Sequence, residues 1–413
     1  MSIENKVPEI RFKGFSGDIS TKNLKEIIIT NTYGPRFNAN DYDSNGNVKT
    51  IRGTDISIDG RVLYNQVPLA SLEVNFIKEH TLEDGDLVMI TTADCGLTGL
   101  FEKQTDKYIC SAYAVKVTLD QELASPLYFK YFFQTTLAKT EINKFIRKAT
   151  VANLPASAIL QIAHKIPCKK EQTAIGNYFQ QLDNLINQHQ QKHDKLSSIK
   201  KAMLEKMFPK QGETIPEIRF KGFSGEWQEK ELGTDVAEII GGGTPSTSIS
   251  EFWNGDIDWY SPTEIGSNVY AKGSQKKITA LGLKNSSAKI LPAGNTVLFT
   301  SRAGIGDMAI LAKPGATNQG FQSFIVKEGF SPYFIYSAGK QIKEFALKHA
   351  SGSTFLEISG KQLGRMKILM PNPDEQIAIG NYFQKLDTLI NQHQQQITKL
   401  NNIKQACLSK MFI

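Results

Sequence analysis

Apolar side chains recur with heptad spacing along two stretches of the chain, residues 169–208 and 371–413. The first stretch carries Ile175, Phe179, Leu182, Leu185, His189 and Leu196 on one stripe, and the second carries Ile379, Phe383, Leu386, Leu389, His393 and Leu400. A stripe of this length predicts a long helix that packs against a partner helix. A long helix that lies along its own domain is the alternative. For the two histidines, a buried polar layer that fixes helix register is favoured over metal ligation.

The two helical stretches are copies of each other. EQTAIGNYFQQLDNLINQHQQ at 171–191 returns as EQIAIGNYFQKLDTLINQHQQ at 375–395, and VPEIRFKGFSG at 7–17 returns as IPEIRFKGFSG at 215–225. Each half of the chain therefore consists of a variable globular domain followed by a long helix. Each helix is the obvious partner of the other, and twofold symmetry favours an antiparallel pair with a domain at each end.

The stretches between the helices alternate between short strands and short helices. GDLVMITT and NTVLFTS are strand-like and are bounded by Gly, Asn and Asp turns. We therefore predict an α+β fold with two repeated globular domains and two long antiparallel coiled-coil helices, and an α/β arrangement of the domains stays open. The expected limits are a first domain at 1–168, a helix at 169–208, a linker at 209–225, a second domain at 226–370 and a second helix at 371–413.

Composition narrows the class of protein. Of the residues, 40% are hydrophobic and 22% are charged, no apolar run approaches membrane-spanning length, and the first residues lack the pattern of a signal peptide. Four cysteines without a CxxC spacing favour reduced thiols, so a cytoplasmic protein is expected. The net charge of +7 favours a polyanionic partner only mildly.

Sequence motifs for catalysis are missing. The chain has no phosphate-binding loop, no HExxH, no GxSxG and no cysteine–histidine set at zinc spacing. The run Gly241–Pro245 fits a tight turn better than a phosphate cradle, because proline follows the glycines and no lysine is present. No catalytic residue, metal or cofactor is therefore expected in this chain. Two mildly basic domains on stiff helices suit a protein that reads two half-sites on DNA, and a bivalent scaffold for other proteins has the same outline.

Several short sequence motifs follow one another along the chain. They are GGGTPSTS, FWNGDIDWYSPTEI, TSRAGIGDMAI, TNQGF and the two EQ-x-AIG helices. With them the chain resembles the specificity subunit (HsdS) of a type I restriction–modification system, over nearly its whole length. The resemblance implies that each variable domain is a target recognition domain and that the helices are the shared regions.

The resemblance also implies partners. It predicts a non-catalytic subunit that reads an asymmetric bipartite site on double-stranded DNA and assembles two methyltransferase (HsdM) subunits and restriction (HsdR) subunits, with an adenine methylated on each strand. S-adenosylmethionine, ATP and Mg²⁺ would belong to those partners. A specificity module of a fused restriction or methylation enzyme is an alternative, but no NPPY motif is present. The bivalent scaffold without a DNA role is the other.

DNA-contacting residues are predicted from polar positions in loops that match the family motifs. The first domain departs from the family there, because ITNTYGPRFNANDYDSNGN (29–47) replaces the GGTPS turn and TTADCG replaces TSRAGIG. For the first domain the candidates are Arg36, Arg52, Thr91, Thr92, Ser111 and Tyr113. For the second they are Thr244, Ser246, Tyr260, Lys272, Ser301, Arg302, Asn318 and Gln319. For each residue, a hydrogen bond within the fold is the alternative to contact with a base.

Overall fold

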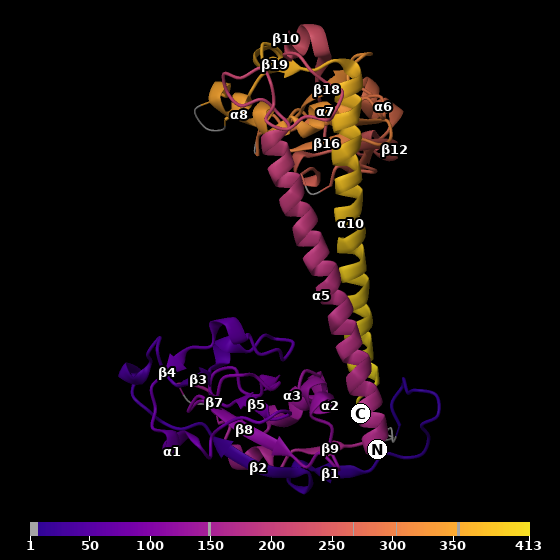
Figure 1. Ribbon diagram of the computed structural model, residues 1–413. Coiled ribbons are helices and arrows are strands. Elements are labelled where there is room, and N and C mark those ends of the chain that lie inside the picture. Colours follow the sequence, from indigo (N-terminus) through magenta and orange to yellow (C-terminus); the bar gives the residue numbers. More distant parts are fainter. Residues whose placement is uncertain (1–6, 148–149, 267, 303, 353–355) are drawn as a thin grey trace. The chain divides into compact units, whose positions relative to one another are not determined.

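The computed structural model describes residues 7–147, 150–266, 268–302, 304–352 and 356–413. The chain forms two compact units (Figure 1). Unit 1 comprises residues up to 189 together with 395–413, and unit 2 comprises 190–394. Each unit thus contains one globular head, part of the first long helix and part of the second. The domain limits expected from the sequence stay predictions.

The head of unit 1 is built on mixed helices and sheets. Its strands form a four-stranded sheet in the order β2-β8-β5-β6, a three-stranded sheet β4-β3-β7 and a pair β1-β9. The strands are β1 (Thr21–Asn23), β2 (Ile28–Tyr33), β3 (Val48–Ile51), β4 (Leu69–Ala70), β5 (Leu87–Ile90), β6 (Thr98–Leu100), β7 (Tyr108–Cys110), β8 (Ala114–Leu119) and β9 (Ala163–Lys165). The helices are α1 (Val74–Ile77), α2 (Pro126–Phe132), α3 (Thr136–Asn143) and α4 (Ala156–Ile159).

The head of unit 2 repeats this plan. A five-stranded sheet β11-β18-β15-β16-β13 lies beside a three-stranded sheet β14-β12-β17 and a pair β10-β19. The strands are β10 (Gln228–Glu231), β11 (Ala237–Gly241), β12 (Trp253–Tyr260), β13 (Tyr270–Ala271), β14 (Lys276–Ile278), β15 (Thr296–Phe299), β16 (Met308–Leu311), β17 (Gly315–Thr317), β18 (Gln322–Val326) and β19 (Lys367–Met370). The helices are α6 (Ala280–Lys284), α7 (Pro332–Ser337), α8 (Gly339–His349) and α9 (Gly360–Gly364).

Two long helices of equal length complete the fold, α5 (Lys169–Lys206) and α10 (Pro373–Lys410), each with 38 residues. At 1.5 Å per residue each spans about 57 Å. In unit 1 the start of α5 packs beside the end of α10, where the rings of Phe179 and Phe412 are 5.9 Å apart. In unit 2 the chain just past α5 packs beside the start of α10, with 6.4 Å between the rings of Phe208 and Phe383. Within each unit the helices are therefore antiparallel, as the sequence predicts.

The apolar stripes serve the heads more than they serve the helix pair. Ile175, Phe179 and Leu182 are buried in the core of unit 1, together with the buried side chains of α2. Their counterparts Ile379, Phe383 and Leu386 are buried in the core of unit 2. Phe179 and Phe383 are fully buried within their own units, so neither side chain is available to a partner subunit in this structure.

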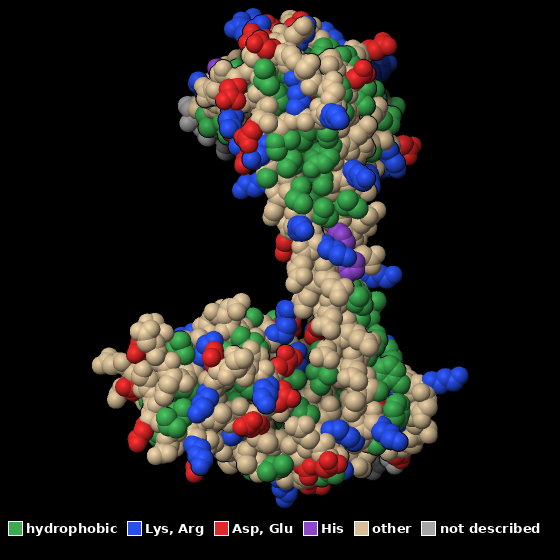
Figure 2. All heavy atoms as spheres, in the orientation of Figure 1, with side chains coloured by type: hydrophobic (Ala, Val, Ile, Leu, Met, Phe, Trp, Pro, Cys, Tyr) green, Lys and Arg blue, Asp and Glu red, His purple; other side chains and the backbone are tan. Residues whose placement is uncertain are grey.

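One position of the first stripe is exposed to solvent. Leu185 is 43% exposed, and its counterpart Leu389 is half-buried. Leu196 and Leu400 are partly buried against the cores of units 2 and 1 respectively. Hydrophobic side chains show at the surface where α5 and α10 enter the head of unit 2 (Figure 2). His189 and His393 are half-buried, and their role in helix register stays a prediction.

Candidate functional site

Each head is attached to the start of one long helix by an arginine–glutamate pair. In unit 1, Arg11 donates to both carboxylate oxygens of Glu171 at 2.7 and 2.8 Å and to the carbonyl of Gly17 at 2.6 Å. In unit 2, Arg219 bonds both oxygens of Glu375 at 2.6 Å. The glutamate raises the pKa of Arg11 by accepting these hydrogen bonds. The arginine of the repeated string RFKGFSG therefore binds the glutamate of the repeated EQ pair at the start of each long helix.

The residues that follow the glutamate seat the helix against the head. Gln172 accepts a hydrogen bond from the backbone N–H of Ser125, the N-cap of α2, at 2.8 Å. Gln376 accepts the same bond from Ser331, the N-cap of α7, at 3.2 Å. A Cβ at Gly176 would lie 3.1 Å from the backbone nitrogen of Tyr128, so this position leaves room for glycine and little more. The EQ-x-AIG motif thus fixes the head on its helix.

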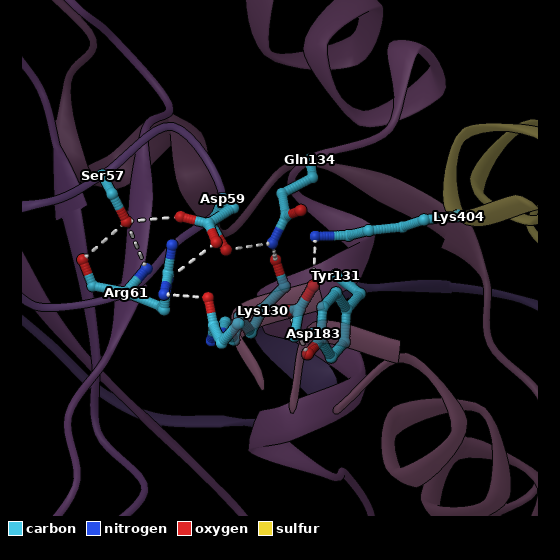
Figure 3. Close-up of polar contacts among 9 residues, drawn as sticks. Ser57, Asp59, Arg61, Lys130, Tyr131, Gln134, Asp183 and Lys404 are labelled. Carbon is cyan, nitrogen blue, oxygen red and sulfur yellow. Dashed lines mark hydrogen bonds and ion pairs between the residues drawn. The ribbon is translucent and has the colours of Figure 1, made fainter. Parts of the chain in front are cut away.

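A buried aspartate joins three elements in each unit. Asp183 of α5 accepts a hydrogen bond from the Tyr131 hydroxyl at 2.7 Å and one from the Lys404 ammonium of α10 at 2.6 Å (Figure 3). Burial and the neighbouring Asp183 carboxylate raise the pKa of Tyr131, so its hydroxyl stays a donor. The cluster ties the α2 helix of the head to both long helices.

Unit 2 contains the same cluster with the helices exchanged. Asp387 of α10 accepts from the Tyr333 hydroxyl at 2.7 Å and from Lys200 of α5 at 2.5 Å. Sequence reasoning singled out none of these residues. A signal was present, because both the Leu-Asp pair and the lysine recur at the same spacing in the two helix copies. We call the arginine–glutamate, glutamine and aspartate contacts together the frame of each unit.

The predicted DNA-contacting residues of unit 1 gather at one edge of the head. Strands β2 and β5 both lie antiparallel to β8, so their carboxyl ends share that edge. The loop after β7 joins them, since the backbone N–H of Ser111 donates to Ile51 at 2.9 Å and that of Thr91 donates to Tyr113 at 2.9 Å. We call residues 34–37, 52, 91–92 and 111–113 the loop edge of unit 1.

The side chains at this edge differ in how freely they reach solvent. Arg36 and Tyr113 are exposed, the latter by 66%. Arg52 is paired within the fold by a bidentate bond to Asp55 at 3.0 Å, which raises the pKa of its guanidinium. Thr92 is half-buried. Thr91 is buried, and its hydroxyl donates to the carbonyl of Tyr113 at 3.0 Å, so its observed role is within the fold.

The loop edge of unit 2 comprises residues 242–246, 260–261, 300–302 and 317–320. Here β11 and β15 both lie antiparallel to β18. The backbone N–H of Asn318 donates to Tyr260 at 3.0 Å, and that of Ser301 donates to Gly320 at 2.7 Å. Thus the edge again unites four loops that lie far apart in the sequence.

Lys272 is the exception among the candidates of unit 2. It follows β13, which runs parallel to β16 and therefore opposite to β15. Because the carboxyl end of β13 is at the other end of the sheet, Lys272 lies away from Ser301 and Arg302. The structure does not bring it together with the other candidates.

Exposure again divides the side chains of unit 2. Tyr260 and Ser301 are buried, and burial raises the pKa of Tyr260 to about 12, so both are enclosed by the fold in this conformation. Thr244 and Gln319 bond each other across two loops, and Ser246 bonds Ser248 at 2.8 Å. Arg302 and Asn318 are half-buried, while Ser246, Gln319 and Lys272 are exposed. The accessible polar groups of this edge are thus mainly hydroxyls, amides and one guanidinium.

Within the described ranges, no group of three His, Cys, Asp or Glu side chains is placed to hold a metal ion. In the same part of the chain, no helix is both long and apolar enough to cross a membrane. The four cysteines are unpaired thiols.

Comparison with known proteins finds the family model "Type I restriction modification DNA specificity domain" twice, at residues 17–198 and 224–402. The MjaIX specificity subunit of a type I restriction enzyme of Methanocaldococcus jannaschii is 36% identical over 192 residues, which are 46% of this chain and 44% of that protein. The EcoR124I/EcoR124II specificity subunit of Escherichia coli is 35% identical over 183 residues, 42% of this chain and 44% of that protein. The matches thus span less than half the length of these curated relatives.

A solved structure also resembles the whole chain. The type I restriction–modification S subunit of M. genitalium superposes with a TM-score of 0.60 at 14% identity, covering 98% of this chain and 99% of that one. A chain from a study of complex assembly in the type I restriction–modification system gives a TM-score of 0.51 at 16% identity, covering 94% of this chain and 96% of that one. At these identities the likeness concerns the fold.

Proposed function

Because the chain belongs to the family of type I restriction–modification DNA specificity domains, of which it carries two, we propose that it reads an asymmetric bipartite site on double-stranded DNA. Each head reads one half-site with its loop edge. The observation that carries this proposal is the contrast within the molecule: the frame is the same in both units, while the loop edges carry different side chains. The same contacts attach each head to the long helices, while the loop edges differ, which suits a protein whose two heads bind different DNA half-sites.

The chemistry of the loop edges supports base recognition. Arg36 and Arg302 carry guanidinium groups that can bond two acceptors of guanine, and Gln319 and Asn318 carry amides that can bond adenine. The net charge of +7 favours approach to the phosphate backbone. The enclosed residues Thr91, Tyr260 and Ser301 serve in this proposal to shape the loops.

We further propose that the chain is a non-catalytic scaffold for two methyltransferase subunits and for restriction subunits. S-adenosylmethionine, ATP and Mg²⁺ then bind those partners. The repeated frame supports two equivalent docking positions, and Leu196, Ile199 and Met203 of α5 offer partly buried apolar surface in unit 2. We expect the purified methylating complex to have the mass of two methyltransferases and one copy of this chain. A complex of one and one with full activity would contradict this arrangement.

An exchange of one head tests whether each head specifies its own half-site. Residues 18–165 are replaced by the matching head of another family member, which keeps Arg11, Glu171 and both long helices in place. The modified adenines are then mapped by long-read sequencing in a host that also expresses the methyltransferase. We expect one half-site to change and the other to stay the same. A change in both halves would contradict independent reading, and a lack of salt-sensitive duplex binding by the assembled complex would favour a scaffold without a DNA role.

A further inference from the structure

The loop edge of unit 1 contains a cavity with aromatic walls. It has a volume of about 540 Å³ and is lined by Arg36, Phe37, Tyr42, Ser111 and Tyr113, among others. This volume lies within the range of about 300–1,000 Å³ that is usual for small-molecule sites. The lining comes from the loop after β2 and from the loop between β7 and β8, two segments that the sequence separates widely.

The two loops that form the cavity are held tightly against each other. A Cβ on Gly34 would lie 2.1 Å from the carbonyl oxygen of Cys110 and 2.3 Å from that of Ser111. The loop after β2 therefore lies directly on the backbone of the second loop, and the backbone N–H of Gly34 donates to Ala114 at 3.0 Å. Such contact keeps the walls of the cavity in place without a ligand.

The groups around the cavity suit a flat heterocycle. Tyr113 is 66% exposed and Tyr42 is 39% exposed, and the rings of Phe37 and Tyr42 meet edge to face at 5.3 Å. Ser111 lines the cavity with only 6% of its surface exposed, and its hydroxyl has no hydrogen-bond partner among the described residues. A buried hydroxyl without a partner is costly. No hydrogen bond holds the Ser111 side chain, so a change of its χ1 rotamer would let the hydroxyl bond a polar ligand atom in the cavity. Arg36 is exposed at the rim and can bond a phosphate.

We propose that this cavity receives one base of the DNA half-site after the base has left the helical stack. The base would stack on Tyr113, its polar edge would bond Ser111, and Arg36 would hold a flanking phosphate. The inference rests on the proposed function of the loop edge and adds to it a position that is recognised outside the duplex. Proteins that extrude a base bind a mismatched base more tightly, since less pairing has to be broken.

The test uses the chain assembled with its methyltransferase and duplexes of the mapped target. A mismatch is placed at each position of the half-site read by unit 1 in turn. We expect one position where the mismatch tightens binding about tenfold, and where Tyr113→Ala abolishes the gain while Tyr113→Phe retains it. Phe76→Ala is the matched control, because this ring is 43% exposed on the same head and does not line the cavity. Any gain at the methylated adenine, a base that methyltransferases extrude, should persist in Tyr113→Ala.

The outcomes separate the inference from the function on which it rests. Specific duplex binding without a mismatch position that depends on Tyr113 would overturn the cavity proposal and leave the reading function intact. Loss of all specific binding in the unaltered complex would overturn both. Free 5′-nucleotides carry the same heterocycles, so they are added in a second arm. If a free nucleotide binds with an affinity that Tyr113→Ala lowers, while no mismatch position depends on Tyr113, the cavity takes a free nucleotide and the proposal of an extruded base is overturned.

Discussion

The same two core positions are polar in unit 1 and apolar in unit 2. In unit 1 the Tyr128 hydroxyl and the His164 ring are hydrogen-bonded at 3.2 Å, and His164 stacks on Phe132 with ring centroids 3.8 Å apart. The strand registers make Ile368 the counterpart of His164, because His164 pairs with Lys22 and Ile368 pairs with Lys230. Phe334 occupies the place of Tyr128, three residues after the N-cap serine in each case.

This difference shows that the core accommodates either a polar pair or an apolar pair at these two positions. A buried hydroxyl or imidazole without a partner costs about 1–3 kcal/mol, so changing one member alone would be unfavourable. The contacts that attach head to helix show no such difference, since arginine, glutamate, glutamine, aspartate and lysine recur in both units. The loop edges lie at the other extreme and share few side chains. Divergence therefore increases from the frame to the core and from the core to the loop edge.

The largest effect is expected where the end of each long helix enters a core. Phe412 contacts the rings of Tyr128 and Phe179, and Phe208 contacts those of Phe334 and Phe383. Because both are buried, Phe412→Ala and Phe208→Ala should each lower the free energy of unfolding by about 3–5 kcal/mol. Hydrogen exchange of backbone amides, followed by mass spectrometry of the complex, should show Phe412→Ala loosening unit 1 and Phe208→Ala loosening unit 2. Uniform loosening by both would contradict separate cores.

A smaller effect should distinguish the two aspartate clusters. The Lys404–Asp183 pair is more buried, with side-chain exposures of 7% and 9%, than the Lys200–Asp387 pair with 23% and 11%. Lys404→Met should cost about 3 kcal/mol because it leaves a buried carboxylate without its cation. Lys200→Met should cost less, about 1 kcal/mol, because Lys200 is itself 23% exposed and water can take the place of its ammonium group beside Asp387. Thermal unfolding of both variants checks the order, and equal losses would mean that burial does not decide the difference.

The sequence predicts the helices and the heads better than it predicts the contacts of their side chains. Heptad spacing and the internal repeat predict two long antiparallel helices and two α+β heads, and the structure confirms both. The same spacing cannot tell which neighbour an apolar residue meets. It places Phe179 and Phe383 on the stripe that packs against a partner helix, although they lie in the cores of units 1 and 2. The Lys404–Asp183 pair was missed because the residues are 221 positions apart.

For the loop edges, the sequence predicts which segments matter and not which side chains are free. Polar residues at the ends of strands look alike whether they point to solvent or to a neighbouring loop. Thr91 and Ser301 are buried against neighbouring loops, while Arg36 and Tyr113 are exposed to solvent. The sequence also cannot show that Lys272 lies apart from the other candidates, because the direction of its strand in the sheet is set by long-range pairing.

Acid should affect unit 1 before unit 2. Burial lowers the pKa of His164 to about 3, so the ring is neutral in the folded state, while in the unfolded chain its pKa is about 6.5. The unfolded state binds the proton first, so this stability is complete above about pH 6.5 and is lost as the pH falls towards 3. At pH 5 the loss should be about 2 kcal/mol.

A double variant provides the control for this pH effect. Tyr128→Phe with His164→Ile copies the apolar pair of unit 2, so it should remove the contribution of His164 without leaving a hydroxyl unpaired. Unfolding at pH 7 and at pH 5, with hydrogen exchange measured in each unit, should show that the acid sensitivity of unit 1 decreases in the double variant. An unchanged pH dependence would mean that other groups set the acid response.

The smallest effect concerns the two ends of the sheet in unit 2. Arg302 lies at the loop edge, close to Gly320, where an added Cβ would be 3.5 Å from its Nε atom. Lys272 lies at the opposite end of the sheet and is exposed.

If the loop edge reads bases, Arg302→Ala should weaken binding of the cognate duplex by about 1 kcal/mol and relax the choice of base at one position. Lys272→Ala should change binding by less than about 0.5 kcal/mol and leave every base preference as it was, because a surface substitution away from the reading residues has little effect. Competition binding of the assembled complex, with duplexes altered at each position of the half-site, measures both quantities at one salt concentration. Relaxed specificity in Lys272→Ala but not in Arg302→Ala would place the reading surface at the other end of the sheet.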